Sequence, residues 1–189
     1  MRIVGGSLKG RRLAAPPGGA VRPTADRARE ALFNRLDHGA FSDDGTSNVA
    51  GASVLDAFCG TGALGLEALS RDAAQAVFID DDDDAIACVR TNTAALGVAD
   101  RAMVLRADAT DPPRAAAPCT LVFLDPPYAG NTITAALPAL AAAGWLAPGA
   151  LCVAESAAKS PAPESPAGFE TLDSRSYGRA RFCFLRFRP

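Results

Sequence analysis

The sequence VLDAFCGTGALG occupies residues 54–65 and decides the fold class. Its first four residues are typical of a buried strand. Gly60, Gly62 and Gly65 then match the spacing G-x-G-x-x-G. In a turn between a strand and a helix, such glycines bring a ligand close to bare backbone at the start of the helix. The stretch therefore predicts the ligand-binding turn of an α/β domain.

From residue 52 onward, apolar runs alternate with helix-like segments, as in a doubly wound, mostly parallel sheet. The last two runs are close enough in sequence to form an antiparallel pair at one edge. We therefore expect a Rossmann-like, seven-stranded α/β domain. The predicted strands are residues 53–57, 76–80, 102–106, 120–124, 150–154, 169–174 and 181–187, and the predicted helices are 63–70, 83–96 and 131–143.

Three parts of the chain are expected: an extension at 1–36, a polar linker at 37–51 and the α/β domain at 52–189. The extension contains a predicted hairpin, whose arms are residues 2–4 and 9–13. A helix is predicted from about Thr24 to Leu36, with Thr24 as its N-cap.

Composition excludes several classes of protein. Hydrophobic residues make up 49% of the 189, but no run approaches about 18 apolar residues, so no membrane span is expected. The start lacks the apolar core of a secretory signal. Five scattered cysteines without a CxxC pair argue against disulfides or zinc and favour the reducing cytoplasm. We expect a cytoplasmic protein, and a monomer.

Charge is segregated along the chain. Residues 1–36 carry a net charge of +6, residues 37–174 carry −13, and residues 175–189 carry five Arg and no acid. Two basic ends therefore bracket an acidic middle, and the total is only −2. Such segregation can build a positive face for nucleic acid on an acidic protein.

The glycine turn alone fits NAD as well as S-adenosylmethionine (SAM). Asp80 follows Gly60 by twenty residues, at a predicted strand end, where its carboxylate can accept both ribose hydroxyls. Asp56 favours SAM, because it would attract an ammonium and a sulfonium but repel a pyrophosphate. The predicted cofactor contacts are Asp56, Phe58, Gly60, Gly62, Asp80 and Asp108.

Other aspartates have simpler interpretations. In the run 80–84, Asp82 to Asp84 are expected to cap and charge the next helix, and consecutive residues converge poorly on a metal ion. No metal site is predicted. Asp108 would accept a hydrogen bond from the adenine amine of the cofactor, or would form a turn.

The tetrapeptide Asp125-Pro126-Pro127-Tyr128 follows the apolar run 121–124 and carries the chemistry. The lone pair of an aromatic amine is conjugated with its ring, so an enzyme must accept hydrogen bonds from the NH2 group. Asp125 and the Pro126 carbonyl can do so. The prolines stiffen the loop, and Tyr128 offers a stacking face. These four residues predict an amine methyltransferase; the alternative is an ordinary Pro-Pro turn.

The chain resembles the bacterial RsmD family along nearly its whole length. The matching residues include RIVGG at 2–6, RPTADRAREALFN at 22–34, GALGLEALSR at 62–71, the tetrapeptide, and GWL at 144–146. This resemblance implies a class I SAM-dependent methyltransferase fold, with an N-terminal extension that contacts RNA. It also implies methylation of the N2 amine of a guanine in 16S ribosomal RNA, within a small-subunit particle. The ribose carboxylate of the family falls on Asp80, where Glu is more frequent.

Phosphate contacts are expected from the basic extension, and such contacts make binding salt-dependent. Arg27 and Arg29 could instead form internal ion pairs with Asp26 or Glu30. The five C-terminal Arg residues could extend the same face. The candidate substrate contacts are Lys9, Arg11, Arg12, Arg22, Thr24 and Arg29.

Other functions use parts of the same pattern. DNA adenine-N6 or cytosine-N4 methylases share the tetrapeptide, but this chain has no room for their separate DNA-reading domain. A protein-glutamine methylase is disfavoured by the basic ends. A nucleotide-binding oxidoreductase and a non-catalytic RNA-binding module remain as alternatives of other classes.

Overall fold

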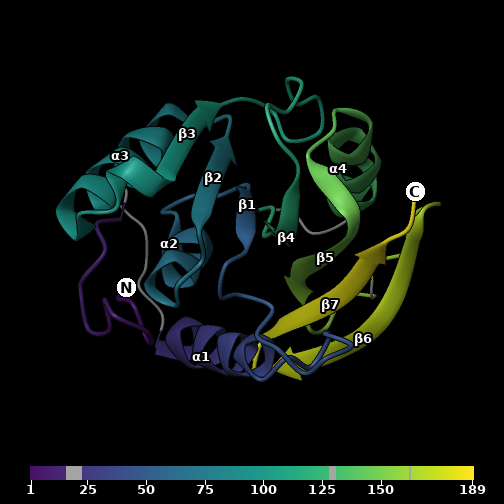
Figure 1. Ribbon diagram of the computed structural model, residues 1–189, viewed down its shortest axis with the longest axis horizontal. Coiled ribbons are helices and arrows are strands. Elements are labelled where there is room, and N and C mark those ends of the chain that lie inside the picture. The colour runs from purple at the N-terminus through teal and green to yellow at the C-terminus, as the bar shows by residue number, and fades with distance from the viewer. Residues whose placement is uncertain (16–22, 128–130, 162) are drawn as a thin grey trace.

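Seven strands form one sheet in the order β3-β2-β1-β4-β5-β7-β6 (Figure 1). This computed structural model describes residues 1–15, 23–127, 131–161 and 163–189, with the backbone alone at 23–25. β1 to β5 pair in parallel, and β7 is antiparallel to both β5 and β6. The strands are β1 Ser53–Ala57, β2 Gln75–Asp80, β3 Ala102–Arg106, β4 Cys119–Leu124, β5 Leu146–Ala157, β6 Phe169–Tyr177 and β7 Ala180–Phe187. The mostly parallel, seven-stranded sheet is confirmed, as is the antiparallel pair at one edge.

Within the described residues, four α-helices accompany the sheet: α1 Pro23–Asp37, α2 Ala63–Ser70, α3 Asp83–Leu96 and α4 Asn131–Ala142. α1 begins at Pro23, so the prediction that Thr24 is its N-cap is wrong. Proline suits the first helical position, because its φ is already helical and its missing N–H would have had no partner there. At α3 the expectation is confirmed, since the Asp82 side chain caps the helix by accepting from the Asp84 N–H. No helix in the described parts of the chain is long and apolar enough to cross a membrane.

Alternate residues of each strand point to opposite faces of the sheet, and each face buries its own core. Phe78 and Phe123 lie on the face covered by α1, α2 and α3, where Phe33 of α1 packs against Phe123. Their neighbours Ile79 and Leu124 lie on the other face, under α4. Because both faces are covered, the central strands are mostly apolar, and their acids, Asp56 and Asp80, lie close to the carboxyl ends of the strands.

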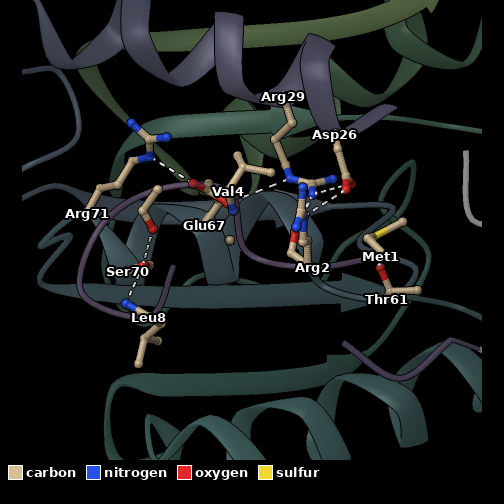
Figure 2. A network of polar contacts seen from close by, with 12 residues as sticks. Met1, Arg2, Val4, Leu8, Asp26, Arg29, Thr61, Glu67, Ser70 and Arg71 are labelled. Carbon is tan, nitrogen blue, oxygen red and sulfur yellow. Dashed lines mark hydrogen bonds and ion pairs between the residues drawn. The ribbon is translucent and has the colours of Figure 1, made fainter. Parts of the chain in front are cut away.

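The predicted hairpin is present in the first 13 residues. The Ile3 N–H donates to the Arg11 carbonyl at 2.9 Å, and Arg2 and Arg12 form an antiparallel bridge. α2 holds this hairpin through side chains that accept backbone N–H groups (Figure 2). Glu67 accepts from Val4 at 2.8 Å, and the Ser70 hydroxyl accepts from Leu8 at 2.9 Å. The hairpin is therefore docked on the α/β domain.

Glu67 is fully buried and is surrounded by cations. Arg71 donates to it from Nε at 2.9 Å, and Nε of Arg29 lies 3.7 Å from its second oxygen (Figure 2). Asp26 and Asp37 each pair with one of these guanidiniums. The carboxylate thus joins the hairpin, α1 and α2 through charged groups that have little contact with water.

Residues 37–51 connect α1 to β1 and contact β7. The Phe41 ring stacks on Phe184 of β7, with 4.4 Å between ring centroids. The Arg186 guanidinium donates to the Phe41 carbonyl, and Val49 is fully buried. Although its sequence is polar, this connection packs against β7.

Candidate active site

One large cleft lies at the carboxyl ends of the parallel strands. Parallel strands end at a common edge, and the chain changes direction between β1 and β4, where open α/β sheets bind their ligands. The cleft has a volume of about 1710 Å³. Its lining includes predicted site residues from four successive strand ends, namely Asp56, Phe58, Gly60, Asp80, Asp108, Asp125, Pro126 and Pro127.

The glycine turn presents backbone to this cleft. The Gly60 N–H donates to Oδ2 of Asp80 at 2.8 Å, which ties the turn to the end of β2. A side chain added at Gly60 would meet no atom within 4 Å, so the turn is open on that side. At Gly65 an added Cβ would lie 2.4 Å from the Phe78 ring. The first glycine leaves room for a ligand, and the last permits close packing of helix on sheet.

Phe58 occupies a strained position between β1 and this turn. Its φ is +60°, in the left-handed region that residues with a Cβ seldom adopt. Strain of this kind costs on the order of 1–3 kcal/mol and clusters at functional sites. Gly62, with φ +76°, is the N-cap residue of α2 and does not line the cleft. Cys59, which follows Phe58, is buried. Burial raises the pKa of its thiol, as is usual for a residue with a packing role.

Asp56 lies deepest in the site, with 1% of its surface exposed. One of its oxygens accepts the Gly65 N–H at 2.8 Å. Burial, with the nearby charges of Asp125 and Asp80, raises the pKa of Asp56 well above its usual range. A bound cation would offset both effects, so this carboxyl fits the positive end of a cofactor.

Asp108 adopts the turn that was one of its two interpretations. Its Oδ1 accepts from both the N–H and the hydroxyl of Thr110, each at 2.7 Å, and these bonds lower the pKa of Asp108. The residue is exposed and lines the cleft. Oδ2 accepts no hydrogen bond within the described residues, so it is available to a donor on a ligand.

The tetrapeptide begins where β4 ends. Asp125 is open to the cleft, and Pro126 is buried in its wall. Although the Asp125 side chain keeps solvent-accessible surface in the cleft, protein atoms lie close around it, and the resulting partial desolvation raises the pKa of Asp125 to about 6. Tyr128, the predicted stacking residue, lies outside the described residues.

Glu155 also lines the cleft, and the sequence analysis missed it. It lies near the end of β5, one strand over from Asp125, and is only partly exposed. Burial and the charge of Asp125 raise the pKa of Glu155 to about 8. Its signal was an acid after the apolar run 150–154, the same pattern that identified Asp80 and Asp125. Met1, Tyr177 and Arg179 line the cleft as well, with no comparable signal.

The predicted substrate contacts divide into three groups. Lys9, Arg11 and Arg12 are exposed on the hairpin, and Nη2 of Arg11 donates to the Ala95 carbonyl at 2.5 Å. Arg29 is different, because it is 5% exposed. The remaining two, Arg22 and the side chain of Thr24, lie outside the described residues.

Arg29 forms the internal ion pair that was its alternative interpretation. Nη2 donates to Asp26 at 2.9 Å and to the Arg2 carbonyl at 2.6 Å. The placement of Arg29 on the phosphate-binding surface is therefore corrected. It forms part of the cleft wall instead, at the base of the docked hairpin.

Most of the C-terminal Arg side chains are bound within the protein. Arg181 and Arg186 donate to backbone carbonyls. Arg175 and Arg188 each pair with an acid on β6, namely Asp173 and Glu170. Arg179 lies in the turn between β6 and β7, exposed at the cleft. Of these five, it is the one best placed for a bound substrate.

Comparison with known proteins agrees with this geometry. The family model described as "Conserved hypothetical protein 95" matches residues 1–186. "Ribosomal RNA small subunit methyltransferase D" of Escherichia coli strain K12 is 34% identical over 182 residues, covering 96% of this chain and 87% of that protein. "Putative rRNA methyltransferase YlbH" of Bacillus subtilis strain 168 is 35% identical, covering 94% of each.

A solved structure is similar over the whole chain. "Putative methyltransferase yhhF from Escherichia coli" superimposes with a TM-score of 0.82 at 32% identity, covering 100% of this chain and 98% of that one. The family model and the relatives span both the docked hairpin and the α/β domain, as the resemblance in sequence did. The chain therefore belongs to the RsmD family of ribosomal RNA methyltransferases.

Proposed function

We propose that this protein transfers a methyl group from SAM to the N2 amine of a guanine in 16S ribosomal RNA. Membership of the RsmD family supports the reaction and the class of substrate. We further propose that it acts as a cytoplasmic monomer on a small-subunit particle.

The position of Asp125 carries this proposal. β4 lies beside β1, with Leu124 in register with Ala57, so the tetrapeptide and the glycine turn follow neighbouring strands. The charge of Asp125 contributes to the raised pKa of Asp56, so the two carboxyls lie near each other in the cleft. An acceptor for an amine thus lies close to the carboxylate that fits a cationic cofactor, and methyl transfer requires this proximity.

The described residues fit SAM, which supplies an electrophilic methyl group on a sulfonium when it is bound. Asp80 receives one backbone N–H on each oxygen, from Gly60 and Asp82, and each oxygen keeps a lone pair for a ribose hydroxyl. The open Oδ2 of Asp108 suits an adenine amine. Asp56 suits the ammonium end, because a cation relieves its unfavourable burial.

Asp125 and Pro126 act on the target amine. The carboxylate accepts one N–H and the Pro126 carbonyl accepts the other, so the nitrogen lone pair is directed toward the methyl donor. Partial desolvation of Asp125 strengthens its interaction with the amine. A strong general base is unnecessary, since the proton leaves after transfer. In this proposal Tyr128 stacks on the base.

The docked hairpin would hold RNA phosphates through Lys9, Arg11 and Arg12. The cleft itself is lined by carboxylates, so phosphates are favoured outside it and the base inside it. A guanine in a loop enters such a cleft cheaply, because it need not be extruded from a duplex.

Labelled methyl transfer tests the proposal. Small subunits from a strain lacking this protein would be the acceptor, and the modified base would be mapped. Asp125→Ala should reduce the rate by at least about 100-fold, whereas Glu170→Gln, on the exposed face of β6, should leave it unchanged. Transfer to DNA amines rather than to ribosomal RNA would overturn the proposal, as would full activity of Asp125→Ala.

A further inference from the structure

Glu155 lies beside Asp125 in the cleft, and the proposed reaction assigns it no role. β4 and β5 are parallel neighbours, and Leu124 is in register with Ala154 (Figure 1). Asp125 and Glu155 are therefore the next residues along two strands that lie about 5 Å apart. Both line the cleft. Two carboxyl groups thus flank the place where the edge of the target base must lie.

Such a pair recognises a base edge that presents donors at adjacent positions. In guanine, the N2 amine is bonded to the carbon next to N1, and N1 carries a hydrogen. In adenine and cytosine, the ring nitrogen next to the exocyclic amine is a bare acceptor. A second acceptor beside Asp125 would therefore bind guanine and repel the lone pair of the other two bases.

We propose that Glu155 is a specificity-determining residue, which accepts the N1–H of the target guanine while Asp125 accepts from its N2 amine. The inference rests on the proposed function and assigns a recognition role at the same site. An acceptor placed against a bare ring nitrogen makes no hydrogen bond and repels the lone pair of that nitrogen. The wrong base is therefore penalised as well as the right base favoured.

Arg29 lies near Glu155 and partly offsets its burial, although the pKa of Glu155 still rises to about 8. Glu155 keeps an acceptor oxygen in either protonation state. The Arg29 guanidinium lines the same cleft and lowers the pKa of Glu155, against the opposing effects of burial and Asp125. Asp26 and the Arg2 carbonyl hold Arg29 in place. The hairpin and α1 thereby supply a fixed positive charge near Glu155. This arrangement gives the buried Arg29 a positioning role in place of a phosphate contact.

The test compares two target bases. Once the modified guanine has been mapped, small subunits would be reconstituted with 16S RNA carrying either guanine or 2-aminopurine at that position. 2-Aminopurine keeps the 2-amine but has a bare N1. For each RNA, kcat/KM would be measured with the unaltered protein, with Glu155→Gln, and with Glu170→Gln as the control. Glu155→Gln keeps the size of the side chain and removes a carboxyl that is unfavourably buried, so the variant should fold.

The unaltered protein and Glu170→Gln should prefer guanine. Glu155→Gln should reduce that preference by about 10- to 100-fold, mainly by slowing the reaction with guanine. For each protein, the kcat/KM with guanine is divided by the kcat/KM with 2-aminopurine. Comparing this ratio between the variants and the unaltered protein cancels the intrinsic difference in reactivity between the two bases. If Glu155→Gln slowed both RNAs equally, or neither, the recognition role would be overturned. If the unaltered protein methylated no guanine N2, the proposed function itself would fail, a result distinct from an unchanged ratio.

Discussion

Replacing Glu67 by Gln tests how the N-terminal hairpin is held. Glu67 is 0% exposed, and it accepts from Val4 at 2.8 Å and from Arg71 at 2.9 Å. Gln has nearly the same shape, but it keeps only one acceptor oxygen and loses the charge. One of the two hydrogen bonds is therefore lost, and an NH2 group is turned toward Arg29 or Arg71.

The magnitude follows from these contacts. A hydrogen bond to a charged group contributes about 1.5–3 kcal/mol, and breaking a buried ion pair costs about 3–5 kcal/mol. Asp26 and Asp37 still pair with the two guanidiniums, which limits the loss. We expect the free energy of unfolding to fall by about 2–4 kcal/mol. For a protein of this length, that corresponds to a Tm lower by roughly 5–15 °C.

Thermal and urea unfolding, followed by circular dichroism, would measure the change. The matched control is Glu30→Gln, an exposed carboxylate on α1, which should shift stability by no more than about 0.5 kcal/mol. If the Tm of Glu67→Gln fell no further than that of Glu30→Gln, the buried carboxylate would not be holding the hairpin, and the assignment would be refuted.

Three further predictions concern the hairpin and the cleft. Gly6→Ala should destabilise the protein by more than Gly10→Ala in urea unfolding: both positions have positive φ, but an added Cβ at Gly6 would lie 1.8 Å from the Ser70 carbonyl oxygen, whereas at Gly10 it would meet nothing within 4 Å. The carboxyls of Asp125 and Glu155 bind protons more tightly in the folded state, with pKa values of about 6 and about 8, so the free energy of unfolding should fall as pH rises from about 4 to 8. Glu155→Gln should flatten that decline, and an unchanged pH profile would contradict the assignment. Replacing Lys9 or Arg12 by Ala should reduce the salt dependence of RNA binding by about one unit of log–log slope each, with calorimetric SAM affinity unchanged; a parallel loss of both affinities would count against the hairpin as a phosphate contact.

The sequence predicted the strands that end at the cleft because their signal is local. An apolar run followed by an acid marks a buried strand and its end, and this rule found Asp56, Asp80 and Asp125. It failed for the length of β5, which runs Leu146–Ala157 although Pro148-Gly149 is typical of a turn. The pairing of β4 with β5 shifts register between Cys119 and Leu121, which lets the longer strand begin earlier.

Other features could not be predicted, because they depend on contacts between distant residues. Whether Arg29 faced RNA or an acid depended partly on Glu67, a residue 38 positions away on another helix. The spacing of the last two strands predicted that they would pair. It could not predict that β7 would insert between β5 and β6, with β6 at the edge.

The segregation of charge along the chain acquires a physical meaning from the position of the cleft. The acidic middle of the sequence supplies the strand ends, so Asp56, Asp80, Asp108, Asp125 and Glu155 meet in one cavity. Such a cavity favours a cationic cofactor and the donor edge of a base, but it repels phosphates. A nucleic-acid substrate therefore needs positive charge outside the cavity, and the exposed Lys9, Arg11 and Arg12 lie on the hairpin that is docked on α2. Met1, at the start of that hairpin, lines the cleft, so a few residues of chain join the proposed phosphate contacts to the proposed base site. If the substrate binds as proposed, the buried network at Glu67 fixes the distance between its phosphates and its target base.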